Sequence, residues 1–219
     1  MSARTTLHLI RHGDAIPEPG KVFDPQTGYD VLGLSAKGRA QAEALAARLS
    51  ATVALAAVYA SPTLRAKETA ETIARATRLE VRFDPRVREI YLGDESVAHI
   101  APEERAQVVR ERLEALAQIA LRDGSWAAVP DVEPAAEVKT RMRAAVDDIV
   151  AAHPNAQVAI VSHAGAINTY LADLLGVPRD FFFPTGNTSI SSVRIENGRA
   201  TLLRLNDTAH LERSVASRA

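Results

Sequence analysis

Short apolar runs alternate along this chain with longer stretches in which apolar residues recur at helical spacing. Runs with the length and residue types of β-strands cover residues 6–10, 54–60, 79–83, 158–162, 189–195 and 200–205. Stretches with the pattern or the start signals of helices cover residues 35–50, 63–77, 102–121, 137–153 and 166–175. The chain therefore repeats the order strand, loop, helix over most of its length.

Local signals place several of the boundaries. Ser35 is a good N-cap residue, and Ser61 followed by Pro62 is a start signal for the second helix. Asn197 and Gly198 separate the last two strands, and this dipeptide is typical of a two-residue β-hairpin turn. The chain is thus expected to end in an antiparallel hairpin.

The alternation of strands and helices predicts an α/β fold. The run 158–162 is apolar throughout, as in strands that are buried on both faces of a parallel sheet. We expect a three-layer sandwich, with a mainly parallel central sheet and helices on both faces. A single domain is expected over residues 1–219, with a small helical insertion at about 95–140.

Composition narrows the functional classes. Apolar residues make up 47% of the 219-residue chain and charged residues 24%, which is typical of a globular protein. The 26 basic and 27 acidic residues leave a net charge of −1, so we expect neither nucleic acid nor a membrane as partner. Cysteine is absent, which excludes thiolate chemistry and disulfides. The first residues lack the long apolar region of a signal peptide, and a cytoplasmic location is expected.

Three polar loops follow predicted strands. They contain Arg11 and His12, then Arg65, then His163. Ligands of open α/β sheets bind beyond the carboxyl ends of the strands, where these loops meet. Attack on a phosphate monoester requires fixed positive charge, a nucleophile and an acid for the leaving oxygen. Arginine forks, neutral imidazole and a carboxylic acid are suited to these tasks, so the loops form a candidate phosphate site.

At these loops the sequence resembles the histidine phosphatase superfamily, which includes phosphoglycerate mutases and many phosphatases. The resemblance spans essentially the whole chain in the expected order. It rests on the segments LIRHGDA (9–15), LSAKGRAQA (34–42), YASPTLRAKETAE (59–71), REIYLGDE (88–95), VSHAGAI (161–167) and GNTSIS (186–191).

The resemblance implies a role for each candidate residue. It makes His12 the nucleophile that becomes phosphohistidine, and it makes Arg11 and Arg65 ligands of the phosphate. His163 completes the phosphate pocket as a further catalytic residue, and Glu89 is the proton donor. The family often follows the glycine after this glutamate with tryptophan and an acidic-glycine pair, whereas this chain continues with residues 94–96 (DES). A neighbouring carboxylate, Asp94 or Glu95, is therefore an alternative donor.

The resemblance leaves several reactions open. We expect a metal-independent phosphomonoesterase that acts on a small phosphorylated metabolite, without a metal ion or cofactor. Phosphoglycerate mutase is the first alternative, but the stretch 90–105 lacks the aromatic and basic cluster that those mutases use for the substrate carboxylate. Phosphohistidine protein phosphatase is the second alternative, and a phospho-ligand binding protein is the alternative outside enzymes.

The aromatic run 180–184 (DFFFP) has three interpretations. It could line the substrate pocket, pack in the core or form the contact of a homodimer.

Overall fold

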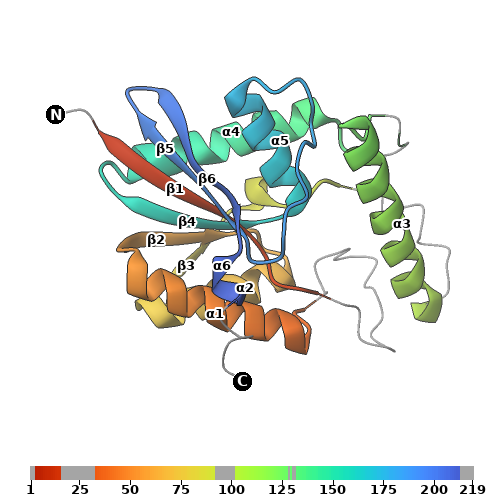
Figure 1. The fold of residues 1–219 in the computed structure, drawn as a ribbon, viewed down its shortest axis with the longest axis horizontal. Helices are drawn as coiled ribbons and strands as arrows, with labels where there is room; N and C mark the ends of the chain where they lie inside the picture. Colours follow the sequence, from red (N-terminus) through yellow and green to blue (C-terminus); the bar gives the residue numbers. More distant parts are fainter. Residues whose placement is uncertain (1–2, 16–32, 92–101, 128, 130–131, 213–219) are drawn as a thin grey trace.

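A six-stranded sheet forms the centre of the protein, in the order β3-β2-β4-β1-β5-β6 (Figure 1). The computed structural model describes residues 3–15, 33–91, 102–127, 129 and 132–212. Strands β3, β2, β4 and β1 are parallel, and β5 and β6 continue the sheet in antiparallel pairing. The strands are β1 (Arg4–Arg11), β2 (Leu55–Ala60), β3 (Val81–Phe83), β4 (Gln157–Ser162), β5 (Ile190–Glu196) and β6 (Arg199–Asp207).

Helices cover both faces of this sheet, so the predicted three-layer α/β sandwich is confirmed. Figure 1 shows α1 and α2 on one face and α4 and α5 on the other. Helix α3 stands apart from both layers, at the end of the molecule where β1 and β4 finish. The helices are α1 (Ala36–Thr52), α2 (Leu64–Thr77), the 3-10 turn η2 (Pro85–Val87), α3 (Pro102–Asp123), α4 (Ala135–Ala152), α5 (Ala164–Leu175) and α6 (Ala209–Glu212).

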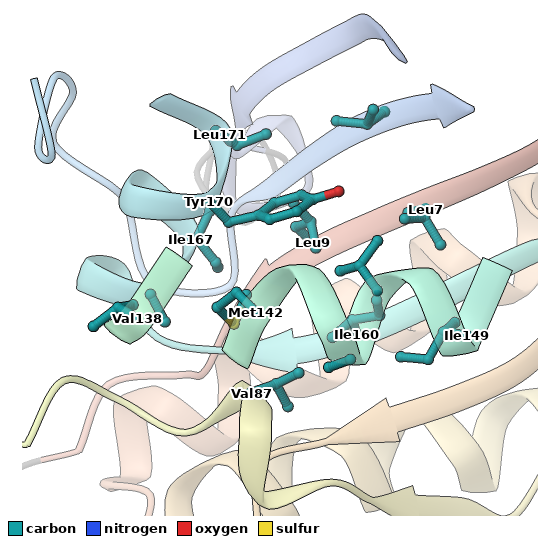
Figure 2. Close-up of a cluster of buried hydrophobic side chains, with 14 of the residues drawn as sticks. Leu7, Leu9, Val87, Val138, Met142, Ile149, Ile160, Ile167, Tyr170 and Leu171 are labelled. Atoms are coloured by element: carbon teal, nitrogen blue, oxygen red, sulfur yellow. The ribbon is translucent and has the colours of Figure 1, made fainter. Parts of the chain in front are cut away.

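Side-chain alternation along β1 divides the core into two clusters. Leu7 and Leu9 point to the α4 and α5 side, where they join Met142, Ile160 and Ile167 (Figure 2). Ile10 points to the other face, against Leu45 and Leu49 of α1 and Ile73 of α2. All of these side chains are at most 1% exposed. The sheet is therefore packed between two buried apolar clusters, and this close packing makes it a rigid support for the loops at its edge.

Helix α4 belongs to one of these layers. Its residues Val138, Met142 and Val146 are fully buried, and the helix packs beside α5 against the sheet. The predicted insertion at about 95–140 thus includes the first turns of a core helix as well as α3. Residues 92–101 lie outside the described part of the chain, and the insertion itself remains a prediction.

Two local signals had different outcomes. Asn197 and Gly198 both have positive φ angles, 53° and 71°, so the hairpin between β5 and β6 turns as predicted. Ser61 and Pro62 do not form the first positions of α2. The helix starts two residues later than this signal predicts, at Leu64, with Thr63 as its N-cap residue. The side chain of Ser61 instead faces His163, at 2.9 Å between Oγ and Nε2.

The aromatic run packs in the core. Phe181 and Phe183 are 8% and 7% exposed and belong to the cluster between the sheet and α5. Core packing is therefore the interpretation that the structure supports for these two side chains. In the part of the chain that is described, the helices are too short or too polar to cross a membrane.

The register of the parallel strands brings the candidate loops together. Arg11 at the end of β1 lies opposite Ser162 at the end of β4, and Ala60 at the end of β2 lies opposite Val161. The residues that follow these positions therefore meet at one edge of the sheet.

Candidate active site

His12 sits at the centre of this edge, 7% exposed. Its amide donates a hydrogen bond to Ser162 O at 3.0 Å, and its carbonyl accepts one from the Thr188 amide at 3.3 Å. The side-chain amide of Asn187 reaches the same carbonyl at 3.2 Å. The His12 backbone is thus fixed between β4 and the loop before β5.

The imidazole of His12 is held in one tautomer. Its Nδ1 lies 2.7 Å from the Gly13 carbonyl oxygen. Because a carbonyl can only accept, Nδ1 must carry the proton, and Nε2 keeps an unprotonated lone pair. That lone pair faces the Arg65 guanidinium, whose Nε donates to it at 3.2 Å. His12 therefore presents an unprotonated nitrogen to the place where Arg65 would hold an anion.

Arg65 also orders the second histidine. It lies in the first turn of α2 and is 5% exposed, and its Nη2 is 3.3 Å from Nδ1 of His163. His163 is fully buried and is the N-cap residue of α5. The two imidazole rings meet edge to face with centroids 5.0 Å apart. Nδ1 of His163 accepts from Arg65, and Nε2 donates to Ser61 Oγ.

Arg11 has an incompletely used guanidinium. Its Nη1 donates to the Thr185 carbonyl at 2.5 Å. Its Nε is buried and has no hydrogen-bond partner among the described residues. Burial lowers the pKa of Arg11, while the charges of Glu89 and Asp14 oppose this shift. A buried, charged N–H group without a partner is suited to binding an anion such as phosphate.

Burial and the two arginines control the protonation of both histidines. Burial lowers the pKa of His12 well below its usual value, and the charges of Arg65 and Arg11 lower it further. The pKa of His163 is also well below the usual value, through burial, Arg65 and His12. Both imidazoles are therefore neutral at neutral pH, which keeps His12 available as a nucleophile.

Glu89 lies beside the start of α5. Its Oε1 accepts hydrogen bonds from the amides of Ile90 at 3.0 Å and Ala166 at 3.1 Å, and its Oε2 accepts one from Gly165 at 3.4 Å. Since His163 immediately precedes this helix, Glu89 is close to the histidine pocket. The alternative donors Asp94 and Glu95 lie outside the described residues.

The structure thus brings together all five residues that the sequence singled out. The residues that hold these five in place were not among the predicted site residues. Ser61, Thr185, Asn187 and Thr188 all belong to the quoted motifs or directly precede one, so their position in the motifs was an available signal. Arg141, which donates to the Glu89 carbonyl, and Glu133, which accepts from Arg141, had no such signal.

Asp14 supports the loop that follows the histidine. Its Oδ2 accepts from Ser35 Oγ at 2.7 Å, and its carbonyl accepts from the Ser35 amide at 2.9 Å. Within the residues that the structure describes, no group of three or more His, Asp or Glu side chains could hold a metal ion.

Two neutral histidines, the buried Arg65 and the half-buried Arg11 lie at the carboxyl edge of the parallel strands, and this arrangement is suited to binding a phosphate group. Residues 7–208 match the family "Histidine phosphatase superfamily (branch 1)". The chain belongs to this superfamily.

Individual relatives include both phosphatases and mutases by name. The chain is 31% identical over 209 residues to phosphoserine phosphatase 1 of Hydrogenobacter thermophilus, covering 94% of this chain and 93% of the relative. It is 29% identical over 175 residues to a Yersinia enterocolitica protein named "Probable phosphoglycerate mutase GpmB", covering 78% of this chain and 75% of the relative.

A solved structure shows the same fold. A mycobacterial glucosyl-3-phosphoglycerate phosphatase superposes with a TM-score of 0.70 at 27% identity, covering 94% of this chain and 99% of the other. The family and these relatives support an enzyme of the phosphatase and mutase type.

Proposed function

We propose that the protein is a metal-independent phosphomonoesterase that acts on a small phosphorylated metabolite through a phosphohistidine at His12. The observation that carries this proposal is the state of the His12 ring. Nδ1 donates a hydrogen bond to the Gly13 carbonyl, and Nε2 is unprotonated and faces Arg65. Such a nitrogen can attack phosphorus without a separate base.

The first half of the reaction forms the intermediate. Nε2 of His12 attacks the phosphorus atom, and the bond from phosphorus to the ester oxygen breaks. Glu89, in its carboxylic acid form, gives its proton to that oxygen, and the alcohol leaves. The guanidinium groups of Arg11 and Arg65 bind the phosphoryl oxygens while charge spreads over them.

The second half returns the enzyme to its starting state. A water molecule gives a proton to the Glu89 carboxylate as its oxygen attacks phosphorus. The bond from phosphorus to Nε2 breaks, and inorganic phosphate and neutral His12 are released. The protein supplies the charge, the nucleophile and the acid, so a metal ion is not required for any step.

Water is the proposed acceptor of the phosphoryl group. The relatives named as phosphoserine phosphatase and glucosyl-3-phosphoglycerate phosphatase support this choice, since each covers more than nine tenths of this chain. The relative named as a mutase keeps phosphoglycerate mutase as a second candidate. In a mutase, a hydroxyl of the substrate would take the place of water at the same phosphohistidine.

Turnover measured against a substrate panel tests the proposal. The panel contains phosphoserine, sugar phosphates, 2- and 3-phosphoglycerate and a phosphohistidine protein, and free phosphate and isomerised product are both measured. We expect phosphate release from a small ester, and loss of this release in His12→Asn. Isomerisation without phosphate release would favour the mutase, and release only from the protein substrate would favour a phosphohistidine phosphatase. Binding without turnover would contradict an enzyme.

A further inference from the structure

A buried ion pair lies beside the backbone of the segment that carries the candidate acid. Glu133 precedes α4 and has a side chain that is 5% exposed, and Arg141 of α4 has one that is 12% exposed. Two hydrogen bonds join them, from Arg141 Nε at 2.7 Å and from Nη2 at 3.0 Å. Among the described residues, neither side chain has a hydrogen bond to His12 or His163, although the charge of Arg141 makes a minor contribution to the lowered pKa of His163.

The rest of the Arg141 guanidinium binds backbone rather than side chains. Nη1 donates to the carbonyls of Arg86 at 2.8 Å and Arg88 at 2.7 Å, and Nη2 donates to the carbonyl of Glu89 at 3.1 Å. Three carbonyls within four residues are therefore gathered by one planar group. The segment after η2 has neither helix nor strand in the described residues, so these bonds replace those of regular structure.

Glu133 holds the same segment from its other end. Its Oε2 accepts from the Tyr91 amide at 3.0 Å, and its own amide donates to the Tyr91 carbonyl at 2.8 Å. Arg88 also donates two hydrogen bonds to the Glu133 carboxylate, from Nη1 to Oε2 at 3.1 Å and from Nη2 to Oε1 at 3.2 Å. Burial raises the pKa of Glu133, but the bonds from Arg141 and the Tyr91 amide outweigh it and leave the pKa lowered. Glu133 is therefore charged at neutral pH.

Glu89 is thus held both by its backbone and by its side chain. Its backbone is bound to Arg141 of α4, while its carboxylate is bound to the first amides of α5. A shift of the backbone moves the carboxylate relative to His163, which starts the same helix. Proton transfer needs the acid within hydrogen-bond reach of the leaving oxygen, so small displacements matter.

We propose that Arg141 and Glu133 are positioning residues that set the carboxyl group of Glu89 for protonation of the leaving group. This inference rests on the proposed function, because it requires Glu89 to be the acid. Arg141 acts through the backbone of residues 86–89, and Glu133 orients the guanidinium and holds Tyr91.

The test compares leaving groups in a double-mutant cycle of Glu89→Gln and Arg141→Met. Single-turnover phosphorylation of the enzyme is measured with p-nitrophenyl phosphate, whose leaving group needs little protonation, and with a primary alkyl phosphate, whose leaving group needs a proton. The ratio of the two rates reports acid catalysis and is insensitive to the fraction of folded enzyme. Arg143→Met is the matched control, since Arg143 lies on the same helix, is exposed, and pairs with Asp173.

We expect Arg141→Met to slow the alkyl ester at least about tenfold more than the p-nitrophenyl ester, within the ~10²–10⁴-fold range of a general acid. Arg141→Lys, which keeps the charge but loses the fork, should show a smaller change in the ratio. In the Glu89→Gln background, Arg141→Met should leave the ratio unchanged, and Arg143→Met should leave it unchanged in either background. Glu133→Gln, which keeps the shape of the side chain, provides a second variant if Arg141→Met does not fold.

Three results would overturn the inference. If Glu89→Gln changes the ratio but Arg141→Met and Glu133→Gln slow both esters equally, the pair is only structural, and the proposed role of Glu89 stands. If the effects of Glu89→Gln and Arg141→Met on the ratio multiply in the double variant, Arg141 does not act through Glu89. If Glu89→Gln itself leaves the ratio unchanged, Glu89 is not the acid, and the proposed mechanism fails together with the inference.

Discussion

A single methyl group at Gly38 should disturb the catalytic loop from outside the site. Gly38 lies in the first turn of α1, where the backbone of Asp14 passes directly over it. A Cβ atom at this position would be 2.0 Å from the Asp14 carbonyl oxygen and 2.9 Å from its backbone carbon and nitrogen. Backbone atoms cannot rotate away as a flexible side chain can, so helix and loop must separate.

The structure allows the size of the effect to be worked out. Relaxed contacts between carbon and a carbonyl oxygen lie at about 3.3 Å, so Gly38→Ala requires a shift of roughly 1 Å. Asp14 follows His12 by two residues, and a misplacement of this size at a catalytic group can cost about 10²-fold in rate. Overpacking costs about 1–3 kcal/mol, and the higher helix propensity of alanine returns about 1 kcal/mol. The net loss of stability should therefore be only about 0–2 kcal/mol.

The assay is kcat/KM for p-nitrophenyl phosphate, together with urea unfolding. Ala47→Gly is the matched control, because Ala47 lies exposed on the same helix and its replacement costs about 1 kcal/mol without touching Asp14. We expect about a 10²-fold loss for Gly38→Ala and unchanged kcat/KM for Ala47→Gly. A Gly38→Ala enzyme within about twofold of the wild type would refute the claim that this contact positions the loop.

Three further predictions concern charge. Turnover should survive exhaustive chelation with EDTA, because Arg11 and Arg65 supply the positive charge; loss that Mg²⁺ restores would contradict this. Vanadate should compete with substrate. Vanadate should inhibit Arg65→Met about 10–100-fold more weakly than the wild type, because the charge-assisted hydrogen bonds from Arg65 are lost. Equal inhibition of the wild type and Arg65→Met would contradict this. The unfolding free energy should fall as pH drops below about 6.5, because the unfolded chain binds protons there that buried His12 and His163, with their lowered pKa values, do not. The unfolding free energy is measured by urea unfolding between pH 7.5 and 5.5 and plotted against pH. In His12→Asn this plot should be shallower than in the wild type, by up to about 1.4 kcal/mol per pH unit. An unchanged dependence on pH would count against the lowered pKa of His12.

The fold was predictable because its signals are local. Strand runs, the N-cap at Ser35 and the Asn197-Gly198 turn each act within a few residues, and the order of elements then leaves few topologies. Ser61 shows the limit of such signals. A serine before proline has the same sequence signature whether it starts a helix or binds a distant histidine, and only the parallel register places it beside His163.

The site was predictable where its residues occur in ordered motifs. Arg141, which binds the Glu89 carbonyl, and Glu133, which binds Arg141, were not predictable, because they lie 52 and 44 residues farther along the chain than Glu89. A glutamate before a helix and an arginine almost two turns into it are charged residues of the kind that is usually exposed. Their burial depends on how α4 packs against the segment after η2, which is a tertiary contact without a local sequence signal.

The isomer of phosphohistidine on His12 tests the central claim most directly. The enzyme is mixed with a ³²P-labelled ester, quenched in alkali within milliseconds, and digested for mass spectrometry and ³¹P NMR. Because Nδ1 donates to the Gly13 carbonyl, the label should be alkali-stable and acid-labile, sit on Nε2 of His12, and be absent from His12→Asn. Label that persists in His12→Asn, or phosphate on Nδ1 of His12, would contradict the account.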